Sequence, residues 1–188
     1  MPQERDGFDD KPKKCLFFLR WQDDNGLHDI SIEIPCRPGV SFLCGESGCG
    51  KTTVTRLING LIPHFFSGEL NGEASVCGFD VIKTAIAELS DHVGSVFQNP
   101  RTQFFNTDTD SEIVFGLENR ALPQEQLKMR LEETCTELEL SSLRKRNIFE
   151  LSGGEKQKIA FASVYATQPE IFVLDEPSSN LDMGAVQN

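Results

Sequence analysis

Polar and apolar residues alternate in the N-terminal part of the chain. Leu27–Ile34 ends with isoleucine at every second position, which is typical of a strand with one face buried and the other exposed to water. Cys15–Trp21 is rich in apolar and aromatic residues, and the turn residues Asp23–Gly26 lie between the two segments. The pattern therefore predicts an antiparallel pair of strands joined by a turn.

Further along the chain, three short apolar runs have the length of buried strands. They are Val40–Cys44, His92–Phe97 and Ile171–Leu174. The last of them reads IFVL and contains no polar residue, which is typical of a parallel strand covered on both faces. Glu69–Val76 is a further strand candidate, and the turn residues Cys77–Gly78 close it.

Between these runs, apolar residues recur at every third or fourth position, which indicates helices. Lys51–Leu61 carries such residues on one face, namely Val54, Leu57, Ile58 and Leu61. Residues 124–140 repeat the pattern with charged residues on the opposite face, and Pro123 suits the first turn of that helix. Residues 111–121 and 159–166 are also predicted to be helical.

Strands that alternate with helices predict an α/β fold with a parallel sheet. Residues 15–100 and 151–188 would form its core, and residues 101–150 a small helical insertion. Residues 1–14 are polar and show no periodicity, so we expect a disordered leader there.

Composition narrows the function classes. The chain has 188 residues, of which 38% are hydrophobic, about the length of one domain with a substantial core. Its net charge of −11 argues against a nucleic-acid-binding surface, because phosphate contacts need clustered lysine and arginine. The six cysteines include no C-x-x-C pair, so we expect reduced thiols, with Cys44 and Cys77 buried in strands. No apolar run approaches the roughly 18 residues of a membrane span, so a role at a membrane would come through partners.

A glycine-rich segment between a predicted strand and a predicted helix fits the phosphate-loop pattern G-x-x-x-x-G-K-[ST]. Glycines allow the backbone to wrap around a polyphosphate, so that its N–H groups and the helix N-terminus point at anionic oxygens. Lys51 would contact the β- and γ-phosphates, and the Thr52 hydroxyl would bind Mg²⁺. Taken alone, the motif could also be a chance glycine-rich turn. The candidate nucleotide contacts are Gly45, Glu46, Ser47, Gly48, Cys49, Gly50, Lys51, Thr52 and Thr53.

Two further groups suit phosphate chemistry. Ser152, Gly153 and Gly154 open a predicted helix, which makes a second anion-binding N-terminus or an ordinary helix cap. Asp175 and Glu176 follow the strand Ile171–Leu174 directly. A carboxylate at a strand end can hold Mg²⁺, and its neighbour can orient or deprotonate an attacking water molecule.

In this combination and order, the motifs resemble the nucleotide-binding domain of ABC-type ATPases. The resemblance implies a P-loop NTPase (RecA-like) core with an antiparallel β subdomain and a helical insertion. It also implies ATP and Mg²⁺ as cofactors and ATP hydrolysis as the reaction. The corresponding segments are Gly45–Thr53 for Walker A, Gln98 for the Q-loop glutamine, Leu151–Glu155 for the signature motif, Ile171–Glu176 for Walker B and Ser178–Asp182 for the D-loop.

Residue roles follow from the same resemblance. Glu176 would be the catalytic carboxylate, and the Mg²⁺ contacts would be Thr52, Gln98 and Asp175. Trp21 falls where the family carries an aromatic residue that stacks on adenine, although a core aromatic at a strand end is an equal alternative. Because the phosphate loop encloses its own nucleotide, residues 152–154 would close over the ATP of a second, paired ATPase domain.

A narrower resemblance is to the ATPases of energy-coupling-factor importers. The matching segments are Leu61–Phe65, Phe97–Phe105, Glu112–Asn119 and Glu155–Lys158. In that family two ATPase domains pair with a transmembrane coupling subunit and a substrate-binding membrane subunit, and power the uptake of vitamins or transition-metal ions. The resemblance places the chain at the cytoplasmic face of the membrane, with residues 98–119 toward the membrane partner. The apolar residues there would form that surface or a local helical core: Phe104, Phe105, Ile113, Val114 and Phe115.

One family feature has no counterpart in this sequence. The family carries a switch histidine on a strand beyond the D-loop, whereas the last histidine here is His92 and the sequence ends at Asn188. We therefore expect a C-terminally truncated domain, and the alternative function is a catalytically weak nucleotide-binding fragment. A soluble non-transport ABC ATPase is a further alternative. The sequence lacks the sustained heptads and basic balance expected of the DNA-maintenance members of that group.

Overall fold

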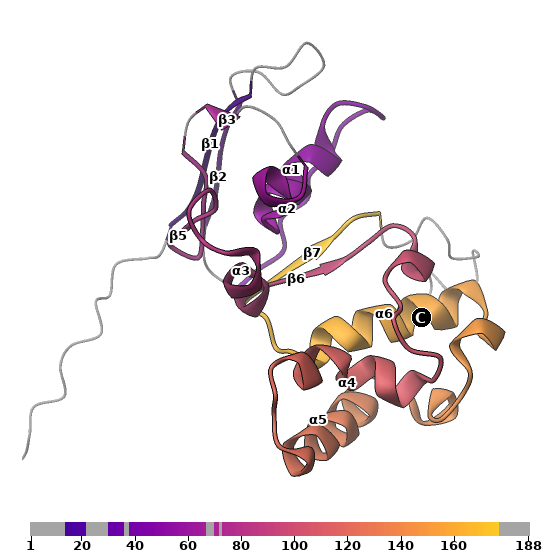
Figure 1. The fold of residues 1–188 in the computed structure, drawn as a ribbon. Coiled ribbons are helices and arrows are strands. Elements are labelled where there is room, and N and C mark those ends of the chain that lie inside the picture. Colours follow the sequence, from indigo (N-terminus) through magenta and orange to yellow (C-terminus); the bar gives the residue numbers. More distant parts are fainter. Residues whose placement is uncertain (1–13, 22–29, 36–37, 67–69, 72, 177–188) are drawn as a thin grey trace, which may run out of the picture. The chain divides into compact units, whose positions relative to one another are not determined.

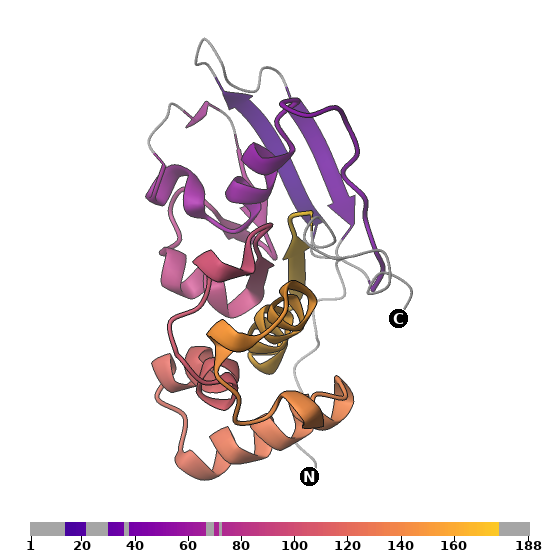
Figure 2. The ribbon, with the colours of Figure 1, turned by 90° about the vertical axis from the view of Figure 1, so that its right-hand side faces the viewer.

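The alternating N-terminal segments form two antiparallel strands in the computed structural model. Strand β1 (Lys14–Trp21) pairs with β2 (Ile30–Pro35), with Cys15 opposite Ile34. Along β2, Ile32 and Ile34 are half-buried and the polar residues between them are exposed. The predicted hairpin strands and their one-sided burial are therefore confirmed. Figure 2 shows β1 and β2 side by side.

The structure describes residues 14–21, 30–35, 38–66, 70–71 and 73–176 (Figure 1). They fall into two units, residues 1–85 and residues 86–188. The predicted D-loop, Ser178–Asp182, lies outside the described residues, as does the predicted leader apart from Lys14, which begins β1. The division into a core and a helical insertion at residues 101–150 stays a prediction.

Two short sheets build the first unit. Strand β3 (Leu70–Asn71) pairs with the end of β1, which gives the order β2-β1-β3, and β4 (Ser75–Val76) pairs with β5 (Phe79–Asp80). The single strand predicted over residues 69–76 is thus wrong. The chain reverses sharply at Cys77–Gly78, where both residues have positive φ values of 51° and 85°, as in the tight turns that favour two-residue hairpins.

The predicted helix over residues 51–61 is shorter than expected. Helix α1 (Lys51–Ile58) buries Val54, Leu57 and Ile58, and α2 (Leu61–His64) follows as a separate turn. Gly60 separates them with a φ of 73°, a left-handed conformation that ends a right-handed helix.

The prediction of a buried strand at residues 40–44 is wrong in this structure. Residues 40–46 have no regular secondary structure, and Val40 and Phe42 are 81% and 86% exposed. Cys44 is exposed too, against expectation, whereas Cys77 is buried as predicted. An extended segment becomes a strand only by bonding to a neighbour, and the described strands of this unit pair with one another.

A parallel strand pair lies at the centre of the second unit. After α3 (Ile86–His92), β6 (Val93–Val96) pairs with β7 (Ile171–Leu174), with Val96 opposite Leu174. The parallel prediction for β7 is confirmed, but its full burial is wrong, because Val173 alone is buried along it. The described sheet here has two strands, which is too few to cover both faces of β7.

Helix α6 (Gly153–Ala166) leads into β7 and packs closely on β6. A Cβ atom on Gly94 would lie 2.4 Å from Val164 Cγ1 and 2.7 Å from Pro169 Cγ. Glycine is therefore required where β6 meets α6, since such distances do not occur between real side chains.

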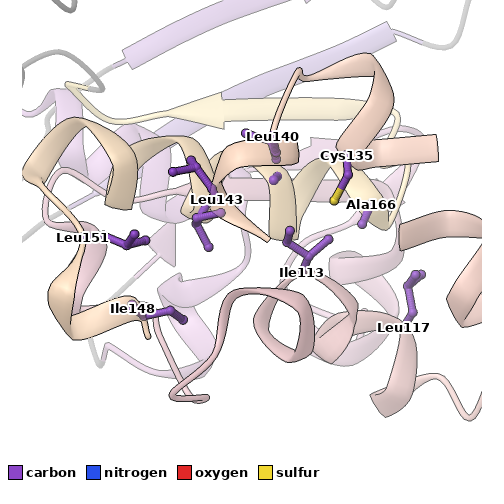
Figure 3. Close-up of a cluster of buried hydrophobic side chains, with 10 residues drawn as sticks. Ile113, Leu117, Cys135, Leu140, Leu143, Ile148, Leu151 and Ala166 are labelled. Carbon is purple, nitrogen blue, oxygen red and sulfur yellow. The ribbon is translucent and has the colours of Figure 1, made fainter. Parts of the chain in front are cut away.

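Two more helices cover α6, as the apolar periodicity predicts. They are α4 (Thr109–Asn119) and α5 (Gln124–Glu137), with 3₁₀ turns at Pro100–Thr102, Ser141–Leu143 and Ile148–Glu150. Figure 3 shows the hydrophobic cluster that they share. Its members are Ile113, Leu117, Cys135, Leu140, Leu143, Ile148, Leu151, Ile159, Ala162 and Ala166.

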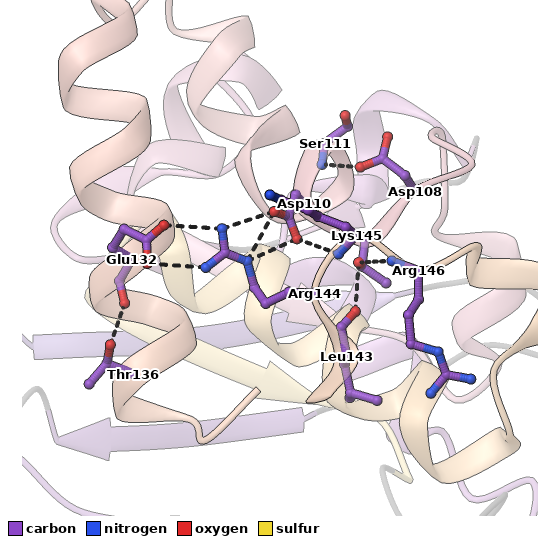
Figure 4. A network of polar contacts seen from close by, with 10 residues as sticks. Asp108, Asp110, Ser111, Glu132, Thr136, Leu143, Arg144, Lys145 and Arg146 are labelled. Carbon is purple, nitrogen blue, oxygen red and sulfur yellow. Dashed lines mark hydrogen bonds and ion pairs between the residues drawn. The ribbon is translucent and has the colours of Figure 1, made fainter. Parts of the chain in front are cut away.

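A charged network ties the start of α4 to α5 (Figure 4). The Arg144 guanidinium donates to both Asp110 oxygens at 3.0 Å and to both Glu132 oxygens at 3.1 Å. These partners raise the pKa of Arg144. At the N-cap of α4, the Asp108 carboxylate accepts a hydrogen bond from the Ser111 N–H at 3.0 Å, and its contacts with Ser111 lower its pKa.

Candidate functional site

The glycine-rich loop of the first unit has a backbone that demands glycine. Gly48 and Gly50 have φ values of 82° and 95°, in the left-handed region where a side chain is unfavourable. Gly45 is also restricted, because a Cβ atom there would lie 2.5 Å from Cys49 Sγ. The loop therefore closes tightly before α1 begins at Lys51.

The Lys51 ammonium folds back over this loop. Its Nζ donates to the carbonyl oxygens of Gly45 at 2.9 Å and Glu46 at 2.8 Å. It also lies 3.9 Å from Cys49 Sγ. A positive charge is thus held over a backbone turn at the start of a helix, where anions bind favourably.

These features fit a nucleotide with Mg²⁺. The loop offers a cation and backbone N–H groups, and nothing lies within 4 Å of a Cβ built on Gly48, so there is open space on that side. Thr52 is exposed at the start of α1, and its hydroxyl is of the oxygen type that Mg²⁺ prefers. The sequence motif is therefore supported by loop geometry, although the role of each residue stays a prediction.

In the second unit, the parallel strands bring Gln98, Asp175 and Glu176 to one edge. The Asp175 N–H continues the strand pairing by donating to the Val96 carbonyl at 3.0 Å. Just beyond, Gln98 Nε2 donates to Glu176 Oε2 at 2.8 Å. Residues 78 positions apart thus meet because the carboxyl ends of parallel strands lie together.

Glu176 has an unusual backbone. Its φ is 46°, a left-handed value that is unfavourable for a non-glycine residue and is found preferentially at functional sites. In the described part of the chain, no group of three or more His, Cys, Asp or Glu side chains could enclose a metal ion. A Mg²⁺ ion at this edge would therefore need phosphate oxygens and water besides its protein ligands.

Ser152 caps α6. Its Oγ accepts from the Glu155 N–H at 3.2 Å, while Glu155 Oε2 accepts from the Ser152 N–H at 2.7 Å. Hydrogen bonds from Ser152 lower the pKa of Glu155, and Arg146 lies 3.0 Å from the same carboxylate. The helix-cap interpretation of Ser152 is therefore observed, and both Ser152 and Gly153 stay exposed.

Sequence reasoning missed Glu155 and Lys156 as residues that hold this turn. The spacing of Ser152 and Glu155 is a recognised capping-box signal, so Glu155 could have been found. Lys156 is 5% exposed, and its ammonium donates to the carbonyls of Phe149 and Leu151. No local signal distinguishes a buried lysine from an exposed one.

A groove of about 630 Å³ lies within the second unit, between α3, α4 and α6. One wall carries Phe105 stacked on Phe115 at 4.8 Å between ring centroids, and Phe105 is 75% exposed. Charged groups also line the groove: Arg120 Nε lies 2.8 Å from the Asp91 carboxylate. The groove is therefore lined by both an aromatic pair and an ion pair.

The predicted apolar surface of this region divides into two parts. Ile113 and Val114 are buried, at 0% and 8% exposure, so their assignment to a surface is wrong and the helical-core alternative holds for them. Helix periodicity turns them inward, while Phe105 precedes α4 and faces solvent. Phe104 packs on the hydrophobic cluster.

The predicted site residues are distributed over both units. Residues 45–53 and Trp21, which ends β1, belong to the first. Gln98, residues 152–154, Asp175 and Glu176 belong to the second. Each unit positions its own residues, and their joint contact with one nucleotide stays a prediction.

Comparison with known proteins identifies the family. A model of the ABC transporter family matches residues 27–179. The chain belongs to the ABC transporter family. The sequence resemblance to ABC-type ATPases and the α/β P-loop NTPase fold class are thereby confirmed. Domains of this family bind ATP with Mg²⁺ and hydrolyse ATP.

Relatives and solved structures agree with this assignment. A putative ABC transporter ATP-binding protein from Treponema denticola is 68% identical over 164 residues, which cover 87% of this chain and 33% of that protein. One from Methanosarcina acetivorans is 39% identical over 170 residues, 90% of this chain and 28% of that protein. The chain thus spans about a third of the length of these curated relatives.

Among solved structures, cbiO1 from Clostridium perfringens, part of the ABC transporter complex cbiONQ, is similar with a TM-score of 0.76 and 27% identity. The match covers 94% of this chain and 70% of cbiO1. Within the described ranges, every helix is too short or too polar to cross a lipid bilayer.

Proposed function

We propose that this chain is the ATP-hydrolysing domain of an importer that resembles the energy-coupling-factor type. In this proposal it drives the uptake of a vitamin or metal ion through membrane partners, from the cytoplasmic face of the membrane. The observation that carries the proposal is the contact between Gln98 and Glu176 at the carboxyl ends of β6 and β7. It joins an amide and a carboxylate suited to water activation, in a chain whose glycine-rich loop also fits the phosphate-loop pattern.

The proposed roles follow from the donor and acceptor chemistry. Lys51 and the loop amides bind the phosphates, and Thr52, Gln98 and Asp175 would hold Mg²⁺. When bound, Mg²⁺ would neutralise charge on the phosphate oxygens. Glu176 orients the attacking water and accepts its proton. Trp21 remains the candidate for stacking on adenine.

A second ATPase domain would complete the site. Ser152 and Gly153 are exposed at the N-terminus of α6, and Glu155 and Lys156 fix the turn that presents them. We infer that residues 152–154 close over the ATP of a paired domain, which could be identical or different. Anion binding at this helix start is compatible with the observed cap, since the Ser152 side chain uses one N–H of several.

The membrane partner would dock at the groove beside Phe105 and Phe115. We assign a helix of a transmembrane subunit as its occupant, because the similar cbiO1 is described as part of a transporter complex. Exposed Phe105 supplies apolar contact and the Asp91–Arg120 pair a polar rim. Such a combination is typical of protein interfaces. Crosslinking from cysteine introduced at Asn106 in source-cell membranes should capture an integral membrane protein, and capture of soluble proteins alone would contradict the docking.

Hydrolysis is tested by Glu176→Gln. This change keeps the size of the side chain but removes the base, so single-turnover ATP hydrolysis at saturating nucleotide should fall at least about 100-fold. ATP affinity should remain. Glu125→Gln, at an exposed position in the first turn of α5, is the matched control and should hydrolyse ATP normally. Equal rates for both variants would contradict the role of Glu176.

A further inference from the structure

Gln157 on α6 has an enclosed side-chain amide without a hydrogen-bond partner. The residue is 7% exposed, and neither Nε2 nor Oε1 meets a donor or acceptor within the described part of the chain. An amide carries two donors and two lone pairs, and burying it unpaired is unfavourable. An apolar side chain of equal length would suit this position better, unless the amide serves another state of the protein.

Helix and strand geometry indicates which part of β6 lies opposite Gln157. Val164 lies seven residues after Gln157, on the same face of the helix. Its Cγ1 packs against Gly94, where an added Cβ atom would lie 2.4 Å away. Because α6 leads into β7, helix and strands run in opposite directions. Seven residues toward the start of α6 span about 10 Å, which equals about three residues along β6. That step leads from Gly94 to Phe97.

Gln103 independently links the same part of α6 to this segment. Its Nε2 donates to the Ala160 carbonyl at 3.4 Å, and its Oε1 accepts from the Phe97 N–H at 3.3 Å. Gln157 lies one helical turn before this link. Both relations lead from Gln157 toward the backbone that carries Gln98.

A second unfavourable feature lies on the other side of that backbone. Glu176, which accepts the hydrogen bond from Gln98, has a φ of 46°. Left-handed backbone is unfavourable for an L-residue with a side chain. The unpaired Gln157 amide would gain hydrogen bonds if the Gln98 segment had a second arrangement, and Gln98 would then no longer contact Glu176.

We propose that Gln157 is a positioning residue that holds residues 97–99 in a second arrangement. In that arrangement Gln98 leaves Glu176, and the Gln157 amide hydrogen-bonds the backbone of the displaced segment. The consequence for catalysis rests on the proposed function: the arrangement in which Gln98 contacts Glu176 is the one assigned to hydrolysis, and the second arrangement separates these two residues. The conformational coupling itself does not depend on nucleotide.

A double-mutant cycle measured without nucleotide tests this coupling. In the unaltered chain, Gln157→Met removes an unpaired amide and should raise the melting temperature by about 2–4 °C. Glu176→Ala removes the partner of Gln98 and should populate the second arrangement. In that background Gln157→Met removes a formed hydrogen bond, and the melting temperature should fall.

Thr134→Val is the matched control. Thr134 Oγ1 is also buried and unpaired within the described residues, but it lies on α5. Its replacement should raise the melting temperature equally in both backgrounds. If Gln157→Met behaves like this control, or lowers the melting temperature of the unaltered chain, the proposal is wrong.

Hydrogen exchange of the peptide spanning residues 97–103 gives a second measurement. Exchange should be slower in Glu176→Ala than in the double variant, because the Gln157 amide protects the displaced backbone. Equal exchange in these two variants would overturn the proposal. A chain that hydrolyses no ATP would contradict the proposed function alone, since both measurements are made without nucleotide.

Discussion

Replacing Gly94 by alanine tests how closely β6 packs on α6. Without a clash, the change would stabilise the chain by about 0.4–1 kcal/mol, because alanine restricts the unfolded state. A Cβ atom here, however, would lie 2.4 Å from Val164 Cγ1 and 2.7 Å from Pro169 Cγ. Neither a branched side chain nor a proline ring can turn away freely, so helix and strand must separate, at a cost of about 1–3 kcal/mol.

Overpacking should outweigh the gain. We expect a net loss of about 1–2 kcal/mol, which corresponds to a fall in melting temperature of about 2–8 °C for a chain of this size. Thermal unfolding followed by circular dichroism measures it. Val164→Ala removes one of the two clashing atoms, so it should cost less in the Gly94→Ala background than in the unaltered chain. An unchanged or raised melting temperature for Gly94→Ala would refute the packing.

Three further predictions concern the cap, the ion network and the loop. Asp108→Ala should lower the free energy of unfolding by about 1 kcal/mol at neutral pH, as measured by urea titration. Because hydrogen bonding lowers the folded-state pKa of Asp108, the difference should shrink as pH falls through that pKa. Asp108→Asn should keep the cap at every pH. Arg144→Met should lower the free energy of unfolding by about 2–3 kcal/mol, because the mostly buried Asp110 carboxylate loses its positively charged partner. Arg144→Lys should lose less, and a smaller loss for Met than for Lys would contradict the network. In a Cys44→Ser background, a maleimide should modify exposed Cys49 before buried Cys77 and Cys135. MgATP should slow the modification of Cys49, which peptide mapping measures. Equal rates with and without nucleotide would mean that the loop binds no phosphate.

The sequence predicts those elements whose pattern is local. Alternating isoleucines indicate the partner strands β1 and β2. The apolar runs indicate β6 and β7, and the composition of β7 indicates a parallel strand. Residues 40–44 show the limit of this reasoning, because an apolar run becomes a strand only beside a neighbour. The division of residues 69–76 into β3 and β4 shows another limit, because the two strands pair with different partners, β1 and β5, which the sequence pattern does not indicate.

The candidate site divides in the same way. Motifs identify the phosphate loop, the Ser152 turn and the carboxylates after β7, because these depend on residue type and spacing. The hydrogen bond from Gln98 to Glu176 depends on the register of two strands far apart in sequence. Burial of Lys156 and Gln157 depends on the packing of α6. Such contacts cannot be predicted without the tertiary structure.

The most direct test of the account is calorimetric titration of the chain with MgATP. Saturable binding is expected, and Lys51→Ala should weaken it at least about tenfold, because the phosphates lose a charge-assisted contact in a loop of backbone amides. Lys83→Ala is the control: this lysine is exposed and pairs with Asp80 instead, so its loss should leave the affinity unchanged. Equal affinity of the chain and Lys51→Ala for MgATP would contradict the assignment of Gly45–Thr53 as the nucleotide-binding loop.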